Sequence, residues 1–356
     1  MKLPERPTDS GEAAFLLALD TQPMEAKSVD TLPDEDGWQF EPKWDGFRCL
    51  AFKAGNTVDL RAKSGKSLSR YFPEMVAALR AAEPHQFVLD GELAVPAGNT
   101  LSFDALQARV HPAASRVARL AAETPALLIL FDCLATEEAG SLLDAPLTER
   151  RTALEAIAKR LGPGSSARLT PFTRDRQEAE RWLMRTHGAL DGIVAKRVDH
   201  PYVPGERAML KVKLSRSADC VVGGFRYAQG STMVGSMLLG LFNAEGKLDH
   251  VGFTSAISNV DRPALTARLE ALRGEPGFTG DAPGGPSRWS TERSAAWVPL
   301  RSELVVEVSY DHVTAGRFRH GTMLVRWRPD KAPRQCTVEQ LQEEARPGRL
   351  IEQILR

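Results

Sequence analysis

Lys43 lies in the run Glu41-Pro-Lys-Trp-Asp-Gly-Phe-Arg48, where an amine, a carboxylate and a glycine could act together on a phosphate group. A lysine amine that burial or neighbouring cations keep neutral can attack phosphorus and form a phosphoramidate. Asp45 could then hold a hydroxyl or a metal ion, and Gly46 would let a ligand approach the backbone closely. The pattern Lys-x-Asp-Gly is short, however, and a surface turn after Pro42 explains it equally well.

Two further groups of residues follow that could serve a nucleotide site. Asp90-Gly-Glu92 is predicted at the end of a hydrophobic strand, where it would project a pair of carboxylates. Phe131 follows the apolar run Leu127–Leu130 and could stack on a base. A plain Asp-Gly turn and a core phenylalanine are the structural alternatives for these two groups.

Two predicted strands carry the remaining charged candidates. Asp191 and Lys196 are an odd number of residues apart, so a regular strand would point them to opposite faces. Both can reach one ligand only if the strand has a bulge or begins after Asp191. Lys211 and Lys213 alternate with Val212 and share one face, which suits a chain of phosphates, although lysines also guard exposed strand edges.

The elements that must position these residues occupy the first part of the chain. Alternating and continuous apolar runs predict two strands within 39–61 and further strands at 87–95, 126–134, 192–196 and 208–213. Helical periodicity predicts helices at 71–82, 101–110, 148–160 and 174–187, the second of them beginning at Ser102. The candidate residues should therefore lie on strands and at strand ends.

The pattern changes after residue 213. Short strands are predicted at 221–227, 236–242, 250–254, 304–313 and 323–328, with one helix at 261–273. Five strands and one helix suit a small Greek-key barrel such as an OB-fold. We expect two domains, 1–215 and 216–356, with the boundary and a hinge within 214–218 and a helical tail at the C-terminus.

Composition excludes several classes of protein. The chain has 356 residues, 42% of them hydrophobic and 26% charged, which is typical of a water-soluble globular protein. It has no run of membrane-spanning length and no signal peptide, so a cytoplasmic location is expected. Four scattered cysteines argue against a zinc site or disulfides. The net charge is zero, so nucleic-acid binding would depend on the locally basic stretches 196–216 and 317–334.

Taken in order, these pieces resemble the covalent nucleotidyltransferase superfamily. The sequences of these motifs resemble those of ATP-dependent DNA ligases. Within that family they are most similar to the stand-alone bacterial C-type ligases, which are related to the end-joining ligase. The resemblance runs from about residue 23 to 333 and is carried by EPKWDGFR, LRAKSGKSLSRYFPE, FVLDGELAV, SFDALQARV, DGIVAKRVDHPY and RWRPDK. It implies an α+β adenylation domain of antiparallel sheets with flanking helices, followed by an OB-fold β-barrel domain.

The resemblance also assigns roles to residues. Lys43 matches the adenylated lysine, Lys211 and Lys213 match the pair that grips the α-phosphate, and Asp45 joins them as a catalytic residue. Three residues are implied to contact defined parts of ATP: Glu41 the adenine edge, Arg48 the ribose and phosphates, and Phe131 the face of the adenine. The other residues implied to bind the nucleotide are Arg61, Glu92, Ile193 and Lys196. The residues implied to orient the pyrophosphate are Arg326, Arg328, Asp330 and Lys331. Glu92 and Asp191 would hold Mg²⁺ or Mn²⁺. Many family members have glutamate where this chain has Asp191.

The implied reaction has three phosphoryl-transfer steps: AMP passes from ATP to Lys43, then to the 5′-phosphate at a nick, and finally leaves as the 3′-hydroxyl seals the strand. The implied partner is nicked duplex DNA, contacted through its backbone without sequence specificity, by a monomer that acts in repair and could have repair-protein partners. Two alternatives stay open: an RNA ligase or capping guanylyltransferase, and a non-catalytic duplex-binding clamp.

Overall fold

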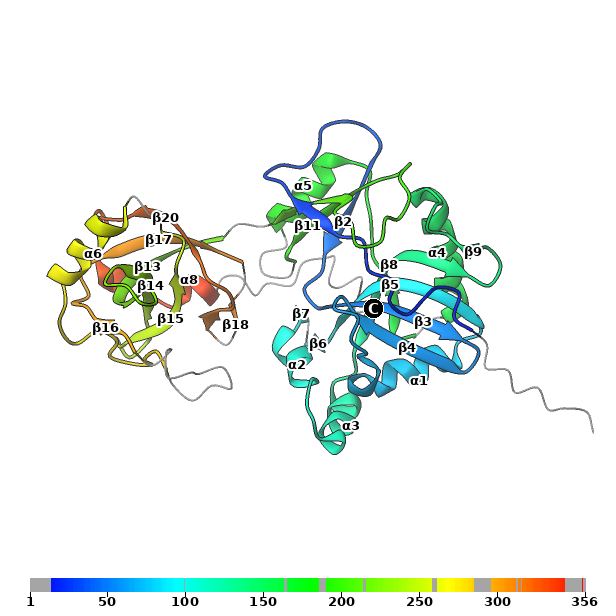
Figure 1. Cartoon of the computed structure of the whole chain (residues 1–356), viewed down its shortest axis with the longest axis horizontal. Coiled ribbons are helices and arrows are strands. Elements are labelled where there is room, and N and C mark those ends of the chain that lie inside the picture. Colours follow the sequence, from blue (N-terminus) through cyan, green and yellow to red (C-terminus); the bar gives the residue numbers. More distant parts are fainter. Residues whose placement is uncertain are drawn as a thin grey trace, which may run out of the picture. The chain divides into compact units, whose positions relative to one another are not determined.

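The computed structural model describes residues 14–98, 100–162, 165–185, 190–213, 216–257, 261–284, 296–311, 313–314, 316–342 and 354. The chain divides into two compact units (Figure 1). The first comprises Met1–Lys213 together with Pro347–Arg356, and the second comprises Leu214–Arg346. Each unit is described below by itself.

The first unit contains two main sheets. The larger has the strand order β10 (Ala167–Leu169), β8 (Leu127–Thr136), β5 (Gln86–Ala94), β3 (Phe47–Ala54) and β4 (Thr57–Ala62), with β9 (Gly140–Ser141) paired to β8. The smaller has the order β1 (Ala26–Ser28), β12 (Met209–Lys213), β11 (Gly192–Arg197) and β2 (Trp38–Lys43). A two-stranded ribbon joins β6 (Pro96–Ala97) to β7 (Thr100–Leu101). The sheets are antiparallel as expected, except for the parallel edge pairs β1–β12 and β10–β8.

Helices pack against both of these sheets. Helix α4 (Leu147–Leu161) packs on β8 and β10, α1 (Pro73–Ala81) packs on β4, and α5 (Arg176–Arg185) packs on β2 and β11 (Figure 1). Helix α2 (Phe103–Ala108) begins as predicted at Ser102, whose hydroxyl accepts a hydrogen bond from Ala105 N at 3.2 Å. Helix α3 (Ala114–Glu123) was not expected, because its N-terminus has no side-chain cap.

The strands at the centre of the larger sheet are buried on both faces. Cys49 and Ala51 pack in one hydrophobic cluster, whereas Leu50 and Phe52 pack in another on the opposite face. The alternation seen in the sequence over 47–51 therefore does not separate a core face from a solvent face. Burial on both sides makes these strands rigid supports for side chains at their ends.

The second unit is an OB-like β domain. Its main sheet has the order β15 (Leu248–Thr254), β14 (Val234–Phe242), β13 (Arg216–Tyr227), β17 (Val305–Tyr310) and β20 (Met323–Trp327). The sheet is open in its ladder pairings, with one parallel bridge between Thr254 and Thr322. Strand β13 begins earlier than predicted because its first residues pair with β17. The smaller elements are α6 (Arg262–Ala271), β16 (Val298–Pro299), β18 (Val313–Thr314), β19 (Arg317–Phe318), the 3₁₀ turn Pro333–Gln335 and α8 (Glu339–Gln342).

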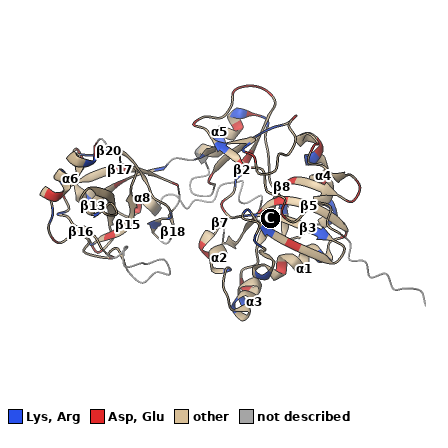
Figure 2. Ribbon diagram, viewed as in Figure 1, with Lys and Arg blue, Asp and Glu red and all other residues tan. Residues whose placement is uncertain are grey.

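Most of the expected C-terminal tail lies outside the described residues. Of residues 343–356 only Ile354 is described, and it packs in the first unit against Trp44, Ala94, Ile129 and Leu190. All four cysteines are free and buried. Acidic and basic positions occur in both units (Figure 2). No helix within the described ranges is both long and apolar enough to cross a membrane.

Candidate active site

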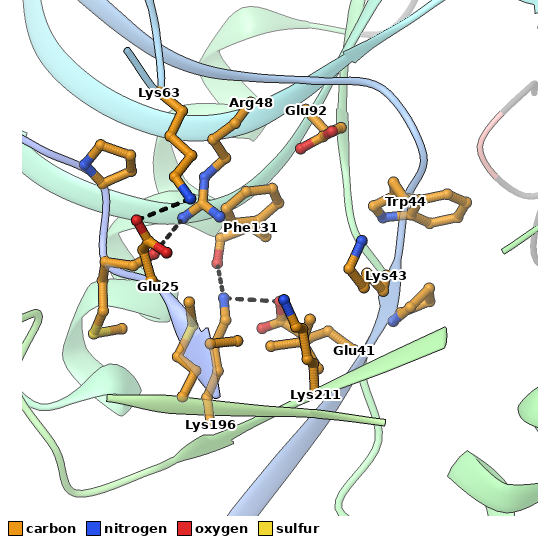
Figure 3. A pocket seen from close by; sticks show the side chains of 16 residues that line it. Glu25, Glu41, Lys43, Trp44, Arg48, Lys63, Glu92, Phe131, Lys196 and Lys211 are labelled. Carbon is orange, nitrogen blue, oxygen red and sulfur yellow. Dashed lines mark hydrogen bonds and ion pairs between the residues drawn. The ribbon is translucent and has the colours of Figure 1, made fainter. Parts of the chain in front are cut away.

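Both sheets of the first unit contribute side chains to one cavity. Glu41 and Lys43 of β2, Lys196 of β11 and Lys211 of β12 line it from the smaller sheet. The lining residues of the larger sheet are Arg48 of β3, Glu92 of β5 and Phe131 of β8. Figure 3 shows these side chains pointing toward a common space. The cavity thus combines an aromatic ring, carboxylates and several cations.

Lys43 is the last residue of β2 and its amine forms an ion pair with Asp191 Oδ2. Strand β11 begins one residue after Asp191, whose backbone N–H donates to Lys43 O at 2.9 Å. Of the two arrangements that could bring Asp191 and Lys196 to one site, the structure therefore shows the strand starting after Asp191. The positive φ of Gly192, +142°, and the clash that a Cβ would make with Val212 O require glycine at this entry to β11.

Gly46 serves packing in the loop after Lys43. A Cβ at this position would collide with Leu93 O and lie 2.9 Å from Glu92 Cγ. The backbone N–H of Gly46 also donates to Glu92 Oε1 at 3.0 Å. Gly46 was predicted to let a ligand approach the backbone closely. In the structure β5 makes that close approach, because the loop packs directly on this strand. Asp45 is not among the residues that line the cavity, although its charge acts on Glu92 and helps to raise the pKa of that carboxyl.

Glu41 is a buried carboxylate with a fixed setting. The residue is 2% exposed. One carboxylate oxygen accepts a hydrogen bond from Gln39 Nε2 and the other pairs with Lys196 Nζ, each at 2.8 Å. Lys196 Nζ also donates to Phe131 O at 3.0 Å, which ties the two sheets together. A buried charge of this kind is stable only when it is paired. Glu41 is therefore held in place at the cavity wall before any ligand arrives.

A β-bulge directs Phe131 into the cavity. In the β5–β8 ladder Asp90 pairs with Asp132 and Gly91 pairs with Leu130, so Phe131 is the extra residue on β8. The Arg48 guanidinium lies 4.5 Å and the Lys196 amine 4.9 Å from the centroid of its ring. Cations at these distances are attracted to an aromatic face. The ring is thus a fixed platform with positive charge beside it.

The run Asp90-Gly-Glu92 lies within β5 and not at its end, because the strand continues to Ala94. Asp90 and Glu92 are two residues apart and point the same way. Asp90 is fully buried and binds Arg48 through both oxygens, with Nε–Oδ1 and Nη2–Oδ2 distances of 2.6 Å. Burial by itself would lower the pKa of Arg48. The Asp90 carboxylate outweighs this effect and raises the pKa of Arg48 above its ordinary value. Arg48 therefore stays a fixed cation.

Glu92 is a cavity carboxylate whose charged form is disfavoured by burial. Burial raises its pKa to about 7, and the nearby charges of Arg48 and Lys43 only partly oppose that shift. Below the ordinary value of 4.5 both the folded and the unfolded chain hold the proton. Between 4.5 and about 7 only the unfolded chain releases it, so folding loses stability as the pH rises through this window.

The variant Glu92→Gln removes this penalty. We expect it to raise the melting temperature, with a larger gain at pH 8 than at pH 5, while it impairs the reaction at the cavity. Thermal unfolding of both proteins at the two pH values tests this. The exposed residue Glu83, changed to Gln, provides a control for charge removal. An equal melting-temperature change at both pH values would contradict the buried-carboxylate explanation.

Lys211 and Lys213 lie on one face of β12, as the alternation predicted. Burial lowers the pKa of Lys211, and repulsion from Lys43 and Lys213 adds to this. The Lys213 amine lies 4.0 Å from Asp191 Oδ1. Lys43 and Lys211 line the cavity, whereas Lys213 and Asp191 lie beside Lys43 outside the lining. Such a cluster is suited to a phosphate chain, whose charge would relieve the mutual repulsion.

The structure places two of the predicted nucleotide residues away from the cavity. Ile193 is fully buried in a hydrophobic cluster with Phe40 on the other face of β11, and Val194 lines the cavity instead. Arg61 binds Asp59 and the carbonyl of Gly65, and does not line the cavity. The prediction for Ile193 failed because neighbouring residues of a strand face opposite sides.

Several cavity residues had no signal in the sequence. Pro23, Met24, Glu25 and Ala26 form one wall, and Trp44, Lys63 and Met209 complete the lining. Glu25 forms an ion pair with Lys63 at 2.9 Å. Ala26 and Met209 come together in the parallel pairing of β1 with β12, a long-range contact that local patterns do not reveal.

The predicted pyrophosphate residues lie in the second unit. Arg328 binds both oxygens of Asp219, at 2.8 and 3.0 Å, and also pairs with Asp330, and Lys331 binds Asp219 at 2.7 Å. The hydrogen bond from Arg328 lowers the pKa of Asp330 to about 2. Arg326 pairs with Glu307. These cations are therefore arranged by carboxylates of their own unit.

The donor set near the cavity fits a magnesium-type ion bound together with phosphates. Within the described part of the chain there is no group of three or more His, Cys, Asp or Glu side chains that could hold a metal by themselves. Mg²⁺ commonly takes one or two carboxylates and completes its shell with substrate phosphates and water. Glu92 at the cavity and Asp191 at Lys43 are carboxylates of that type.

Comparison with known proteins identifies the family. Residues 23–213 match the ATP dependent DNA ligase domain and residues 230–331 match the ATP dependent DNA ligase C terminal region. The chain belongs to the ATP-dependent DNA ligase family, and it is accordingly an enzyme of that class.

Among its relatives are stand-alone ligases of the C type. DNA ligase C2 of Mycolicibacterium smegmatis is 44% identical over 336 residues, covering 90% of this chain and 93% of the relative. DNA ligase C of Mycobacterium tuberculosis is 42% identical with the same coverage. A solved Lig E DNA ligase shares the fold at 15% identity, with a TM-score of 0.53, and matches 86% of this chain and 100% of its own.

Proposed function

We propose that this enzyme seals nicks in duplex DNA through an AMP carried on Lys43. The observation that supports this most strongly is the position of Lys43 in one cavity with Phe131, Glu41 and Lys211. An aromatic platform and a buried carboxylate suit an adenine base, whereas the lysines suit its phosphates. The nucleophile therefore lies where the base and the phosphates of ATP could be bound at once.

In the first step the neutral Lys43 amine attacks the α-phosphorus of ATP. The Nζ–P bond forms, the bond from the α-phosphorus to the bridging oxygen breaks, and pyrophosphate leaves. Lys43 must first lose a proton, and Asp191 Oδ2, which accepts a hydrogen bond from Nζ, is placed to take it. Lys211 and Lys213 bind the α-phosphate and stabilise the charge that develops there.

Before this attack, ATP is bound by groups whose positions are already fixed. Glu41 accepts hydrogen bonds at the adenine edge, Phe131 lies under the base, and Arg48 contacts the ribose and phosphates. Lys196 fixes the positions of Glu41 and Phe131 relative to each other, since it binds Glu41 Oε2 and Phe131 O. Preorganised contacts of this kind lose little entropy when ATP binds.

Two later steps transfer AMP to the DNA and seal it. The 5′-phosphate at a nick attacks the phosphorus of lysyl-AMP and releases Lys43. The 3′-hydroxyl then attacks the activated 5′-phosphate, a phosphodiester forms and AMP leaves. Mg²⁺ or Mn²⁺ held by Glu92 and Asp191 would neutralise phosphate charge during these transfers. Each step depends on the same cavity, so one site serves all three.

The second unit completes the enzyme in this proposal. We infer that it is a closed OB barrel, supported by two contacts between its edge segments: Thr254 Oγ1 donates to Thr322 O at 2.8 Å and Thr322 N donates to Phe253 O at 2.9 Å. Its residues Arg326, Arg328 and Lys331 would orient the departing pyrophosphate. The first unit and the second, which ends at Arg346, would move about a hinge at 214–218.

Nicked duplex DNA is the proposed partner, bound through its backbone without sequence reading. We propose a monomer that acts in DNA repair, near the nucleoid of a bacterial cytoplasm, where repair proteins could be further partners. Strand sealing would then weaken as salt rises, because phosphate contacts release counterions.

A singly nicked duplex with a 5′-phosphate tests the proposed function. Incubation with ATP should yield the sealed strand, whereas NAD and GTP should not support sealing. A duplex whose nick carries a 5′-hydroxyl is the control, because AMP has no phosphate to join. Labelling of the enzyme by GTP, or sealing of nicked RNA alone, would favour the RNA ligase or capping alternative and overturn the proposal.

A further inference from the structure

The hydroxyl of Tyr202 joins two walls of the nucleotide cavity. Tyr202 is 3% exposed, and its hydroxyl accepts a hydrogen bond from Met24 N at 2.8 Å. The same hydroxyl donates to Asp90 Oδ2 at 2.6 Å. Met24 lines the cavity, whereas Tyr202 does not. The hydroxyl therefore acts on the site through its neighbours.

Asp90 links the Tyr202 hydroxyl to Arg48. The Arg48 guanidinium donates to both Asp90 oxygens, and its Nη2 donates to Met24 O at 3.2 Å. A closed ring of hydrogen bonds thus runs from Met24 through Tyr202 and Asp90 to Arg48 and back to Met24. Two of its members, Met24 and Arg48, line the cavity. Removing one hydroxyl would loosen both at once.

Tyr202 is itself held firmly. Its backbone N–H donates to Leu143 O at 2.8 Å, and the Arg150 guanidinium lies 5.6 Å from its ring centroid. The next N–H, of Val203, donates to Met24 Sδ at 3.4 Å. Burial, together with the charge of Asp90, raises the pKa of Tyr202 well above its ordinary value. The hydroxyl is therefore a neutral donor in a fixed position.

We propose that Tyr202 is a positioning residue for ATP binding, whose hydroxyl sets the place of the Arg48 guanidinium and of the Met24 wall. This inference rests on the proposed binding of the nucleotide beside Arg48. Without the hydroxyl, the buried N–H of Met24 loses its acceptor and Asp90 loses a donor. Arg48 and the wall would then adopt a wider range of positions, and ATP would have to order them on binding.

The test is Tyr202→Phe, which keeps the ring and removes only the hydroxyl. The rate of lysyl-AMP formation is measured against ATP concentration with labelled ATP. We expect the half-saturating ATP concentration to rise about tenfold, and the maximal rate to fall less than about threefold. Tyr71→Phe, which removes a hydroxyl outside the ring of hydrogen bonds, should leave both values unchanged. An unchanged half-saturating concentration in Tyr202→Phe would overturn the inference.

A double-mutant cycle separates positioning from a loss of general stability. If Tyr202 acts through Arg48, adding Tyr202→Phe to Arg48→Ala should raise the half-saturating ATP concentration less than about twofold further. The full tenfold penalty in the Arg48→Ala background would overturn the inference. Should Tyr202→Phe fail to fold, Asp90→Asn breaks the same ring and must show the same dependence on Arg48, or the inference fails.

Arg48→Ala separates the place where the nucleotide binds from the role of Tyr202. If Arg48→Ala itself leaves the half-saturating ATP concentration unchanged, the nucleotide does not bind beside Arg48; the proposed role of Arg48 and this inference then both fall, whereas nick sealing through Lys43 still stands. If Arg48→Ala weakens ATP binding and Tyr202→Phe does not, only the role of Tyr202 is lost.

Discussion

Lys43→Ala should abolish strand sealing with ATP, a loss on the order of 10⁴-fold or more, because the amine is the only proposed acceptor of AMP. Labelled ATP should leave no acid-stable AMP on the variant protein. Lys43→Arg should behave in the same way, since a guanidinium keeps the positive charge but does not lose its proton at working pH. The measurement is single-turnover sealing of a nicked duplex.

A nick that already carries AMP on its 5′-phosphate provides the control for this variant. Its sealing does not need the lysyl-AMP, so Lys43→Ala should keep this activity within about tenfold of the parent enzyme. Loss of both activities to the same extent would mean that the variant disturbs the whole cavity. Sealing with ATP at the parent rate would contradict the covalent mechanism.

Lys211→Ala should slow lysyl-AMP formation by roughly 10²- to 10³-fold, the usual effect of removing one group that stabilises developing charge. Lys211 lines the cavity beside Lys43, and its half-buried position gives its charge more effect than a solvated lysine would have. The measurement is the maximal rate of AMP transfer to the protein at saturating ATP.

The chain offers a matched control on the neighbouring strand. Lys27 of β1 is exposed and pairs with Leu210, so it points to the opposite face from Lys211. Lys27→Ala should therefore react at the parent rate. Equal losses in the two variants would show that overall positive charge matters, and not the position of Lys211 at the phosphates.

Local patterns in the sequence predict part of this site well. The period of two along a strand correctly placed Lys211 and Lys213 on one face. The same rule showed that Asp191 and Lys196 needed an irregularity, and the structure supplies it as a strand that begins after Asp191. The Ser102 cap and the helix that follows it were also predicted, because these signals involve residues close in sequence.

Other features depend on contacts between distant segments. The bulge that turns Phe131 into the cavity appears only in the pairing of β5 with β8. The wall around Met24 exists because β1 pairs with β12, and its hydrogen bond to Tyr202 spans most of the first unit's sequence. Ile193 was misplaced because a one-residue change along a strand reverses the side-chain direction. No local pattern encodes these pairings.

The central claim is that Lys43 carries the AMP, and mass spectrometry of the protein after incubation with ATP tests it most directly. The protein is digested and the peptide that gains the mass of one AMP is fragmented to locate the modified residue. We expect one adduct, on the amine of Lys43, that disappears when nicked DNA is added after free ATP has been removed. An adduct on Lys211, Lys213 or another lysine, or an AMP on Lys43 that nicked DNA does not remove, would contradict it.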